Sequence, residues 1–296
     1  MMKSGFVALA GRPNAGKSTL INSLVNEKIA IVSPKPQTTR SEIRGIVNTE
    51  DAQIVFTDTP GIHKAKHRLE TRMNKEASNV IQGVDLIYLV TDGTKAFGTG
   101  DEFVLNMVKN AGVPVFLIFN KIDLLPKELV LKNLMSWQKR YAFDEFFPLS
   151  ALKTESFEDL LNTTVSYLPE GEPLYPREVV SDNPENFRIA EIIREKVLLF
   201  TEEEVPHATA VVIERKEFVK DACEIQAMIL VEKPGQKAIL IGKQGSMLKQ
   251  IGIAARKDIE QLLGTHVRLS LFVRIEEEWR DIDSRITQYG YGHVDE

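Results

Sequence analysis

The chain has 296 residues, of which 43% are hydrophobic and 27% charged, and its formal net charge at pH 7 is −5. This length predicts two domains, and the acidic balance excludes a protein that coats nucleic acid with its whole surface, so any polyanion site must be local. The single cysteine, Cys223, excludes a disulfide framework, and without an apolar run of roughly 18 residues we expect neither a membrane span nor a secretory signal.

Short, almost continuously apolar runs alternate with helical patterns through the first half of the chain. Continuous apolar runs are typical of strands buried on both faces of a parallel sheet, so residues 1–170 predict an α/β doubly wound domain. Ligands of such sheets bind at the carboxyl ends of the strands, where the motifs described below lie. The predicted strands are 6–10, 54–58, 85–92 and 113–120, and the predicted helices are 17–26, 69–82, 99–111, 127–140 and 156–167.

The stretch Gly11–Thr19, GRPNAGKST, fits the phosphate-binding pattern G-x-x-x-x-G-K-S between a predicted strand and a predicted helix. Backbone N–H groups of such a loop, together with the positive end of the following helix, converge on phosphate oxygens. Lys17 would reach the β- and γ-phosphates, and the Ser18 hydroxyl would bind Mg²⁺. A coincidental glycine turn is the alternative, but it does not explain the flanking strand and helix.

The stretch DTPG, Asp58–Gly61, ends the second predicted strand. We expect Asp58 to hold Mg²⁺ through water and Gly61 to offer its N–H to the γ-phosphate, although the tetrapeptide is also an ordinary turn. Residues 33–42 contain two prolines and no apolar period, which predicts a mobile loop with a threonine that senses the γ-phosphate. Thr38 and Thr39 both qualify for that role, and we favour Thr39.

The stretch NKID, Asn120–Asp123, follows the fourth predicted strand and selects the base. A carboxylate at Asp123 can accept hydrogen bonds from N1–H and the exocyclic amine of guanine, whereas adenine offers neither arrangement. Asn120 and Lys121 would brace the loop and stack on the base. Ser150–Leu152 would touch guanine from the other side. Alone, each of these short stretches is compatible with a simple turn; their order after the phosphate loop predicts a guanine nucleotide site.

The second half begins after a proline-bearing linker, 171–185, and predicts a domain over 186–296 with the element order α-β-β-α-α-β and a tail helix near 279–288. From Lys233 to Lys257 there are six Lys or Arg residues and no Asp or Glu, and this local positive charge suits a polyanion. Gly242–Gly245, GKQG, joins two predicted helices without a metal-binding hydroxyl directly after its lysine. This context fits the G-x-x-G turn of a KH domain, which binds about four single-stranded nucleotides; a plain helix corner is the alternative.

The expected RNA contacts are the glycine turn, nearby cations and two apolar residues: Lys233, Lys237, Ile239, Ile241, Gly242, Lys243, Gln244, Gly245, Lys249 and Arg256. Ile239, Ile241 and Ile251 are candidates for an apolar groove wall, with core packing as the alternative for each. For Cys223 we expect a buried filler role in a reducing, intracellular setting.

The motifs GRPNAGKST, QTTR and DTPGIH resemble those of the Era family of GTPases, and the resemblance covers essentially the whole chain. It implies a P-loop GTPase with a doubly wound mixed sheet, followed by an α+β type II KH domain. It implies catalytic roles for Asn14, Lys17, Thr39 and Gly61, and Mg²⁺ binding by Ser18, Thr39 and Asp58. The implied GTP-binding residues are Gly11, Arg12, Pro13, Asn14, Ala15, Gly16, Lys17, Ser18, Thr19, Asp58, Thr59, Pro60, Gly61, Asn120, Lys121, Asp123, Ser150, Ala151 and Leu152.

The resemblance also implies how hydrolysis proceeds. Related GTPases orient the attacking water with a glutamine after the DxxG glycine, but here Ile62 follows Gly61 and His63 is interpreted as a solvated loop residue. We therefore expect slow intrinsic hydrolysis. Related members with an asparagine in the phosphate loop use it to bind K⁺, and Asn14 occupies that place.

The resemblance implies a monomer that binds the 3′ end of small-subunit ribosomal RNA and acts in assembly of that subunit, in the cytoplasm with peripheral contact to the inner face of the membrane. Two alternatives remain open. One is an RNA-binding protein that holds GTP only as a structural ligand, although a complete Mg²⁺ set argues against it. The other is a tRNA-modification GTPase, although no additional chemistry domain is visible in the sequence.

Overall fold

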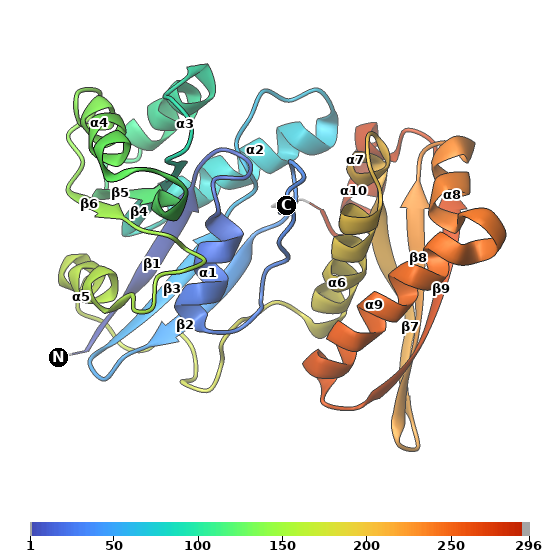
Figure 1. Cartoon of the computed structure of the whole chain (residues 1–296). Coiled ribbons are helices and arrows are strands. Elements are labelled where there is room, and N and C mark those ends of the chain that lie inside the picture. Colours follow the sequence, from blue (N-terminus) through green and yellow to red (C-terminus); the bar gives the residue numbers. More distant parts are fainter. Residues whose placement is uncertain (1, 292–296) are drawn as a thin grey trace. The chain divides into compact units, whose positions relative to one another are not determined.

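The computed structural model describes residues 2–291 and divides into two compact units (Figure 1). Unit 1 comprises Met1–Ala30, Thr39–Lys66 and Glu70–Asp182, and unit 2 comprises Ile31–Thr38, His67–Leu69 and Asn183–Glu296. Two short segments of the first half thus belong with the second unit, although the sequence predicts them to lie in the first domain, 1–170. Unit 1 also extends to Asp182, into the predicted linker 171–185. The outermost ends of those ranges, residue 1 and residues 292–296, lie outside the described residues.

Unit 1 contains a six-stranded sheet in the order β2-β3-β1-β4-β5-β6. Strand β2 is antiparallel to β3, and the other neighbours are parallel, so the sheet is mixed as predicted. The strands are β1 Lys3–Ala10, β2 Ile43–Asn48, β3 Ala52–Asp58, β4 Leu86–Asp92, β5 Val115–Asn120 and β6 Glu145–Pro148.

Two of these strands, β2 and β6, were not predicted, and both lie at an edge of the sheet. Strand β2 carries Arg44 and Gly45 among its apolar residues, and β6 has four residues that are half-buried or exposed. Edge strands are not covered on both faces, so they lack the continuous apolar run by which the central strands are found.

Helices cover both faces of this sheet (Figure 1). Apolar residues of α2, α3 and α4 form one core cluster with the central strands, including Ala77, Val104 and Trp137. On the other face, the Tyr88 hydroxyl of β4 is hydrogen-bonded to Thr164 of α5, and α1 packs against β2 and β3. The helices are α1 Lys17–Val25, α2 Arg68–Gln82, α3 Thr99–Lys109, α4 Lys127–Gln138 and α5 Glu158–Tyr167, with a 3₁₀ turn η1 at Ile122–Leu124.

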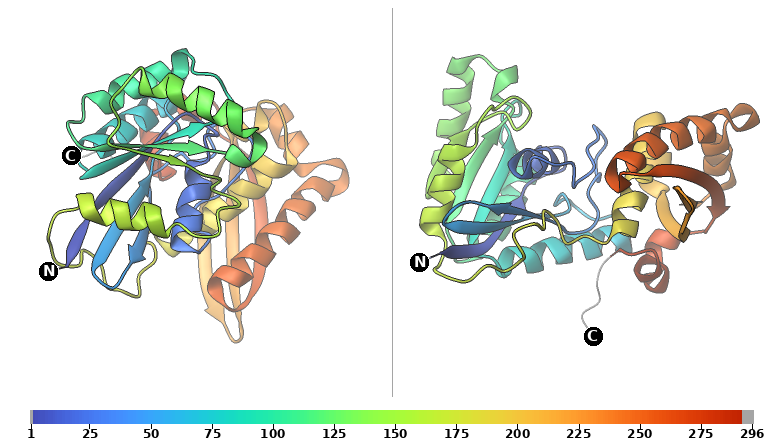
Figure 2. Two further views of the ribbon diagram at one scale, coloured as in Figure 1. Left: turned by 60° about the vertical axis from the view of Figure 1, so that its left-hand side comes forward. Right: turned by 90° about the horizontal axis from the view of Figure 1, so that it is seen from below.

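Unit 2 contains a three-stranded sheet in the order β7-β8-β9, antiparallel between β7 and β8 and parallel between β8 and β9. Helices α6 and α9 lie side by side on one face of it (Figure 2), and their apolar residues share one core with the strands. The elements are α6 Glu185–Phe200, α7 Val205–Ala208, β7 Ala210–Val219, β8 Ala222–Val231, α8 Pro234–Ile241, η2 Lys243–Gly245, α9 Ser246–Leu263, β9 His266–Ile275, η3 Trp279–Asp281 and α10 Asp283–Gln288.

The predicted order of unit 2 is therefore present, with the short α7 added and the tail formed by η3 and α10. Cys223 is fully buried within the core of this unit, and burial raises the pKa of its thiol. Among residues 2–291, no helix combines the length and the apolar character that crossing a bilayer requires.

Candidate nucleotide and nucleic-acid sites

The phosphate loop connects β1 to α1, and Gly16 is the residue that precedes the helix. Its φ of 99° lies in the left-handed region, and a Cβ there would come within 2.1 Å of the Asn120 side-chain nitrogen. Only glycine permits both the conformation and the approach. The loop can therefore lie directly against the end of β5, where the base-selecting motif begins.

Lys17 is 5% exposed, and its Nζ lies 3.4 Å from the Gly11 carbonyl oxygen and 3.5 Å from that of Arg12. Burial lowers the pKa of Lys17. Asp58 attracts this buried ammonium, and its contacts to the two carbonyl oxygens are long. An anion would stabilise it further, because desolvation is then compensated. The position of Lys17 thus suits a phosphate group.

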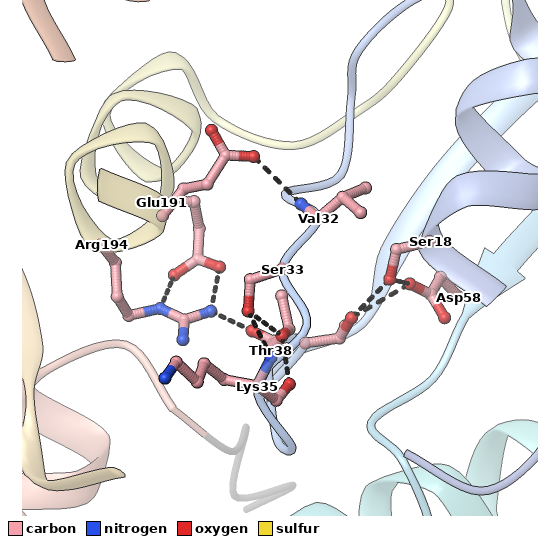
Figure 3. A network of polar contacts seen from close by, with 10 residues as sticks. Ser18, Val32, Ser33, Lys35, Thr38, Asp58, Glu191 and Arg194 are labelled. Atoms are coloured by element: carbon pink, nitrogen blue, oxygen red, sulfur yellow. Dashed lines mark hydrogen bonds and ion pairs between the residues drawn. The ribbon is translucent and has the colours of Figure 1, made fainter. Parts of the chain in front are cut away.

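Three oxygen-bearing side chains meet beside the phosphate loop (Figure 3). Ser18 donates a 2.6 Å hydrogen bond to Asp58 Oδ2, Thr39 donates one of 3.2 Å to the same atom, and the two hydroxyl oxygens are 2.8 Å apart. Asp58 is fully buried, its Oδ1 has no hydrogen-bond partner within the described residues, and burial raises its pKa. Two hydroxyls and a buried carboxylate are hard oxygen donors, so these residues fit Mg²⁺.

The structure separates the two candidate threonines. Whereas Thr39 lies with Ser18 and Asp58, the Thr38 hydroxyl donates to the Lys35 carbonyl oxygen at 2.8 Å and lies 2.8 Å from Ser33 Oγ. The side chain of Thr38 therefore makes hydrogen bonds within its own loop, and Thr39 is the threonine placed to complete the metal site.

The base-selecting loops are joined by Asn120. Its side-chain nitrogen donates to the Ala15 carbonyl oxygen at 2.9 Å, and its oxygen accepts from the Lys121 and Ala151 backbone N–H groups, both at 2.8 Å. One side chain thus fixes the phosphate loop, the NKID stretch and the Ser150–Leu152 loop relative to one another. This is the bracing role that the sequence predicts for Asn120.

Lys121 Nζ donates to the Asn14 carbonyl oxygen and to Asp92 Oδ2, both at 2.8 Å. Burial alone would raise the pKa of Asp92, but hydrogen bonds from Lys121 and Thr94 lower it overall. Asp92 is not among the site residues predicted from the sequence. A signal was present, because it is an acidic residue at the carboxyl end of a buried strand, where site residues gather.

Asp123 accepts a hydrogen bond from Ser150, which lowers its pKa, and lies 3.2 Å from Lys153 Nζ. Its side chain is 17% exposed, and the lowered pKa keeps the carboxylate charged at the rim of the site. Such a group can accept the two donors of a guanine edge. Leu152 is 79% exposed, and Ala151 contributes its backbone N–H to Asn120.

Several residues of the implied GTP set direct their side chains elsewhere. Arg12 forms a 3.0 Å ion pair with Asp101 of α3, and Thr59 donates to the Leu9 carbonyl oxygen of β1 at 2.9 Å. Pro13 packs closely against Gly61, because a Cβ added to Gly61 would lie 2.8 Å from the Cα of Pro13. These side chains therefore contact the surrounding protein and support the loops.

Ile62 is 1% exposed and belongs to the core cluster of unit 1, so it cannot orient a water molecule. The interpretation of His63 as a solvated residue is wrong. Its side chain is 24% exposed, and its Nδ1 is 2.8 Å from the Gly61 carbonyl oxygen. The Ile62 N–H donates to the Gly11 carbonyl oxygen at 3.3 Å, so the peptide after Gly61 is held from both sides.

The second glycine loop adopts a conformation that non-glycine residues rarely take. Gly242 has φ 71° and ψ 177°, and Gly245 has φ 78° and ψ 11°. A Cβ on Gly242 would lie 2.8 Å from the Met247 backbone nitrogen, whereas one on Gly245 would meet nothing within 4 Å. The turn leaves open space at Gly245 into which a polynucleotide backbone can come close.

A groove of about 320 Å³ begins at this turn and runs between α9 and β9. Leu248, Ile253, Leu269 and Leu271 supply apolar surface, and Lys249 and Arg256, both exposed, supply positive charge. Apolar walls with cations at the margin suit unstacked bases joined by phosphates.

The apolar wall is not the one that the sequence predicts. Ile239 is 53% exposed and Ile241 half-buried, and neither lines the groove; Ile251 is fully buried in the core. Strand β9, distant in sequence from the glycine turn, forms the facing wall of this groove. The core-packing alternative is confirmed for Ile251, and RNA contacts of Ile239 and Ile241 stay a prediction. Of the predicted cations, Lys233, Lys243, Lys249 and Arg256 are exposed and Lys237 is half-buried. Gln244 has φ 52°, within the turn itself.

Comparisons with known proteins agree with this geometry. Residues 6–121 match the family described as 50S ribosome-binding GTPase, and residues 204–280 match the KH domain family. The chain is 47% identical over 293 residues to GTPase Era of Lacticaseibacillus paracasei, covering 99% of this chain and 98% of that protein.

Two crystal structures of Era are similar along the whole chain. A variant from Aquifex aeolicus bound to GDP and AlF4⁻ matches with a TM-score of 0.95 at 38% identity, covering 99% of this chain and 100% of that one. Era in complex with MgGDPNP and nucleotides 1506–1542 of 16S ribosomal RNA matches with a TM-score of 0.96, at the same identity and coverage.

Proposed function

This chain belongs to the Era family of GTPases, and from that membership we propose that it couples the nucleotide state of unit 1 to the binding of small-subunit ribosomal RNA by unit 2. The observation that carries the proposal is the presence of two complete sites in one chain. Ser18, Thr39 and Asp58 meet beside the phosphate loop, and a basic, apolar-walled groove follows the second glycine turn.

The protein hydrolyses GTP to GDP and phosphate. Lys17 and the backbone N–H groups of the phosphate loop bind and orient the phosphates, and Ser18, Thr39 and Asp58 would hold Mg²⁺, which neutralises charge that develops on the phosphate oxygens. Asp123 selects guanine. Because Ile62 is buried, its side chain cannot orient the attacking water. The peptide between Gly61 and Ile62 is braced by His63 and Gly11, which keeps Gly61 in place for its own N–H to bind the γ-phosphate. We therefore propose slow intrinsic turnover.

The RNA partner follows from the related complex. An Era of the same fold binds nucleotides of 16S ribosomal RNA, and the groove of this chain has the chemistry for single-stranded RNA. We propose that this chain binds the 3′-terminal segment of small-subunit ribosomal RNA and acts in assembly of that subunit. The alternative, in which GTP is only a structural ligand, has no observation in its favour.

Nucleotide state is expected to change the RNA affinity of the full chain. An oligonucleotide with the 3′-terminal sequence of small-subunit ribosomal RNA should bind about tenfold more tightly with a non-hydrolysable GTP analogue than with GDP, since coupling free energies are typically about 1–3 kcal/mol. Fluorescence anisotropy at fixed salt measures both affinities, with an oligonucleotide of the same composition and shuffled sequence as the control. Equal RNA affinities in the two nucleotide states would contradict the proposed coupling.

We propose that Asn14 binds K⁺, which supplies positive charge near the phosphates. Asn14 lies in the phosphate loop with φ 63°, and its carbonyl accepts from Lys121. Na⁺ has the same charge but a smaller radius, so a site matched to K⁺ holds Na⁺ weakly and loses the added charge. Replacing K⁺ with Na⁺ should therefore slow single-turnover hydrolysis about tenfold, since one added positive charge at the transferred phosphoryl group is worth at least that much. The variant Asn14→Gly tolerates the positive φ and removes only the side chain, so it should hydrolyse GTP equally slowly in both ions. A wild-type rate that does not depend on the ion contradicts K⁺ binding.

A further inference from the structure

An arginine of unit 2 holds the loop that precedes Thr39. Arg194 of α6 is fully buried, and its Nε and Nη2 donate to the two carboxylate oxygens of Glu191, at 2.7 and 2.5 Å. The same Nη2 also donates to the backbone carbonyl oxygen of Thr38 (Figure 3). A guanidinium fixed by a bidentate pair has little rotational freedom, so the second N–H of Nη2 points in one fixed direction.

The loop is held to α6 at its other end as well. The Val32 backbone N–H donates to Glu195 Oε1 at 3.0 Å, and Lys196 holds the other carboxylate oxygen of Glu195 at 2.7 Å. Within the loop, Ser33 Oγ accepts from the Lys35 N–H and lies 2.8 Å from the Thr38 hydroxyl. Residues 31–38 therefore form a braced segment of unit 2 whose two ends are attached to adjacent residues of one helix.

The boundary between the units falls at the Thr38–Thr39 peptide. A trans peptide is planar, so fixing the direction of the Thr38 C=O fixes the Thr39 N–H in the opposite direction. The Thr39 side chain lies with Ser18 and Asp58 in the metal site. One peptide group thus carries the Arg194 contact on its carbonyl side and the nucleotide-sensing residue on its amide side.

We propose that Arg194 is a positioning residue for GTP hydrolysis: by holding the Thr38 carbonyl, it orients Thr39 toward the metal and the γ-phosphate. This proposal rests on the proposed function, because Thr39 matters only if it senses that phosphate. It assigns to the RNA-binding unit a residue that affects chemistry in the GTPase unit. GDP lacks the γ-phosphate, so its affinity does not depend on Arg194.

The competing explanation is that Arg194 only stabilises unit 2. Removing one member of a buried ion pair leaves the other charge buried without a partner, which destabilises the fold. The double variant Glu191→Gln, Arg194→Met avoids that, because it removes both charges together and keeps most of the side-chain volume. A matched control carries the same two substitutions at the exposed pair of unit 2, Glu224→Gln with Arg268→Met, whose partners are 2.8 Å apart.

In the full chain, the double variant at 191 and 194 should hydrolyse GTP about tenfold more slowly in single-turnover assays, and its affinity for a non-hydrolysable GTP analogue should fall severalfold. These magnitudes correspond to the coupling energies carried by residues that contact neither ligand. Its GDP affinity should equal that of the wild type, as should every property of the control variant. Arg194→Lys, which keeps the charge but loses the fork, should be slowed to an intermediate rate.

If the folded double variant hydrolyses GTP at the wild-type rate, the positioning role fails. A parallel loss of GDP and GTP-analogue affinity also overturns it, because that pattern indicates a general loss of stability. The proposed function fails separately, if the wild-type protein shows no dependence of RNA affinity on nucleotide in the same preparation.

Discussion

The substitution Asp123→Asn is expected to weaken binding of GTP and GDP by about 10³-fold. The carboxylate of Asp123 is charged and partly exposed at the rim of the site, where it can accept hydrogen bonds from both N1–H and the exocyclic amine of guanine. A carboxamide has one acceptor and places an N–H₂ group opposite the guanine amine, so one donor is left facing another. Sites built on hydrogen bonds to a substrate discriminate by about 10⁴–10⁵-fold when a partner is lost, and the open rim reduces that penalty.

The same variant should gain affinity for xanthosine diphosphate, because xanthine carries a carbonyl where guanine carries the amine, and the introduced carboxamide can donate to it. Titration calorimetry with both diphosphates measures the exchange. Asp159→Asn, an exposed aspartate of α5, is the matched control and should leave both affinities unchanged. A GDP affinity within about threefold of the wild type would show that Asp123 does not read the base.

The second large effect is expected from Gly245→Asp, which should reduce affinity for single-stranded ribosomal RNA by at least about 100-fold and leave GDP affinity unchanged. The turn at Gly245 lies at the mouth of the groove, and the groove contains Lys249 and Arg256. A carboxylate there would repel the phosphate backbone at close range and would neutralise part of the positive field.

Gly245→Asn is the control that makes this test specific. Asparagine has nearly the volume of aspartate and tolerates a positive φ, and a Cβ at this position meets no atom within 4 Å, so the two variants share whatever backbone strain arises. Asparagine should cost severalfold in RNA affinity, and aspartate much more. Equal losses in the two variants would assign the effect to backbone shape instead of charge. Gly242→Asp is less informative alone, because its Cβ would collide with the Met247 backbone.

Much of the nucleotide site could be predicted because its parts are short and contiguous. The phosphate loop is a run of adjacent residues between a strand and a helix, and its conformation follows from Gly16 and from the start of α1. Asn120 and Asp123 lie at the end of a strand that is recognisable by its continuous apolar run. Backbone geometry of this kind is local, so a single stretch of sequence specifies it.

The edge strands and the groove wall could not be predicted in the same way. The apolar pattern of strand β2 is broken by polar residues and a glycine, because this edge strand is only partly buried. Its pairing with β3, and not its own sequence pattern, makes this segment a strand. Leu269 and Leu271 reach the groove because β9 pairs with β8 beneath α9. Their alternating pattern predicts a half-buried strand and does not indicate which helix lies opposite.

Taken by itself, the sequence determined the fold class, the two sites and the choice of base, since each of these depends on residues close together in the chain. The tertiary structure alone decided that Thr39 and not Thr38 joins Ser18 and Asp58, and that residues 31–38 belong with α6 through Arg194 and Glu195. The physical reason is that the contacts with α6 join residues 156 and 163 positions apart, and a buried arginine within an amphipathic helix has no local pattern that reveals its partner.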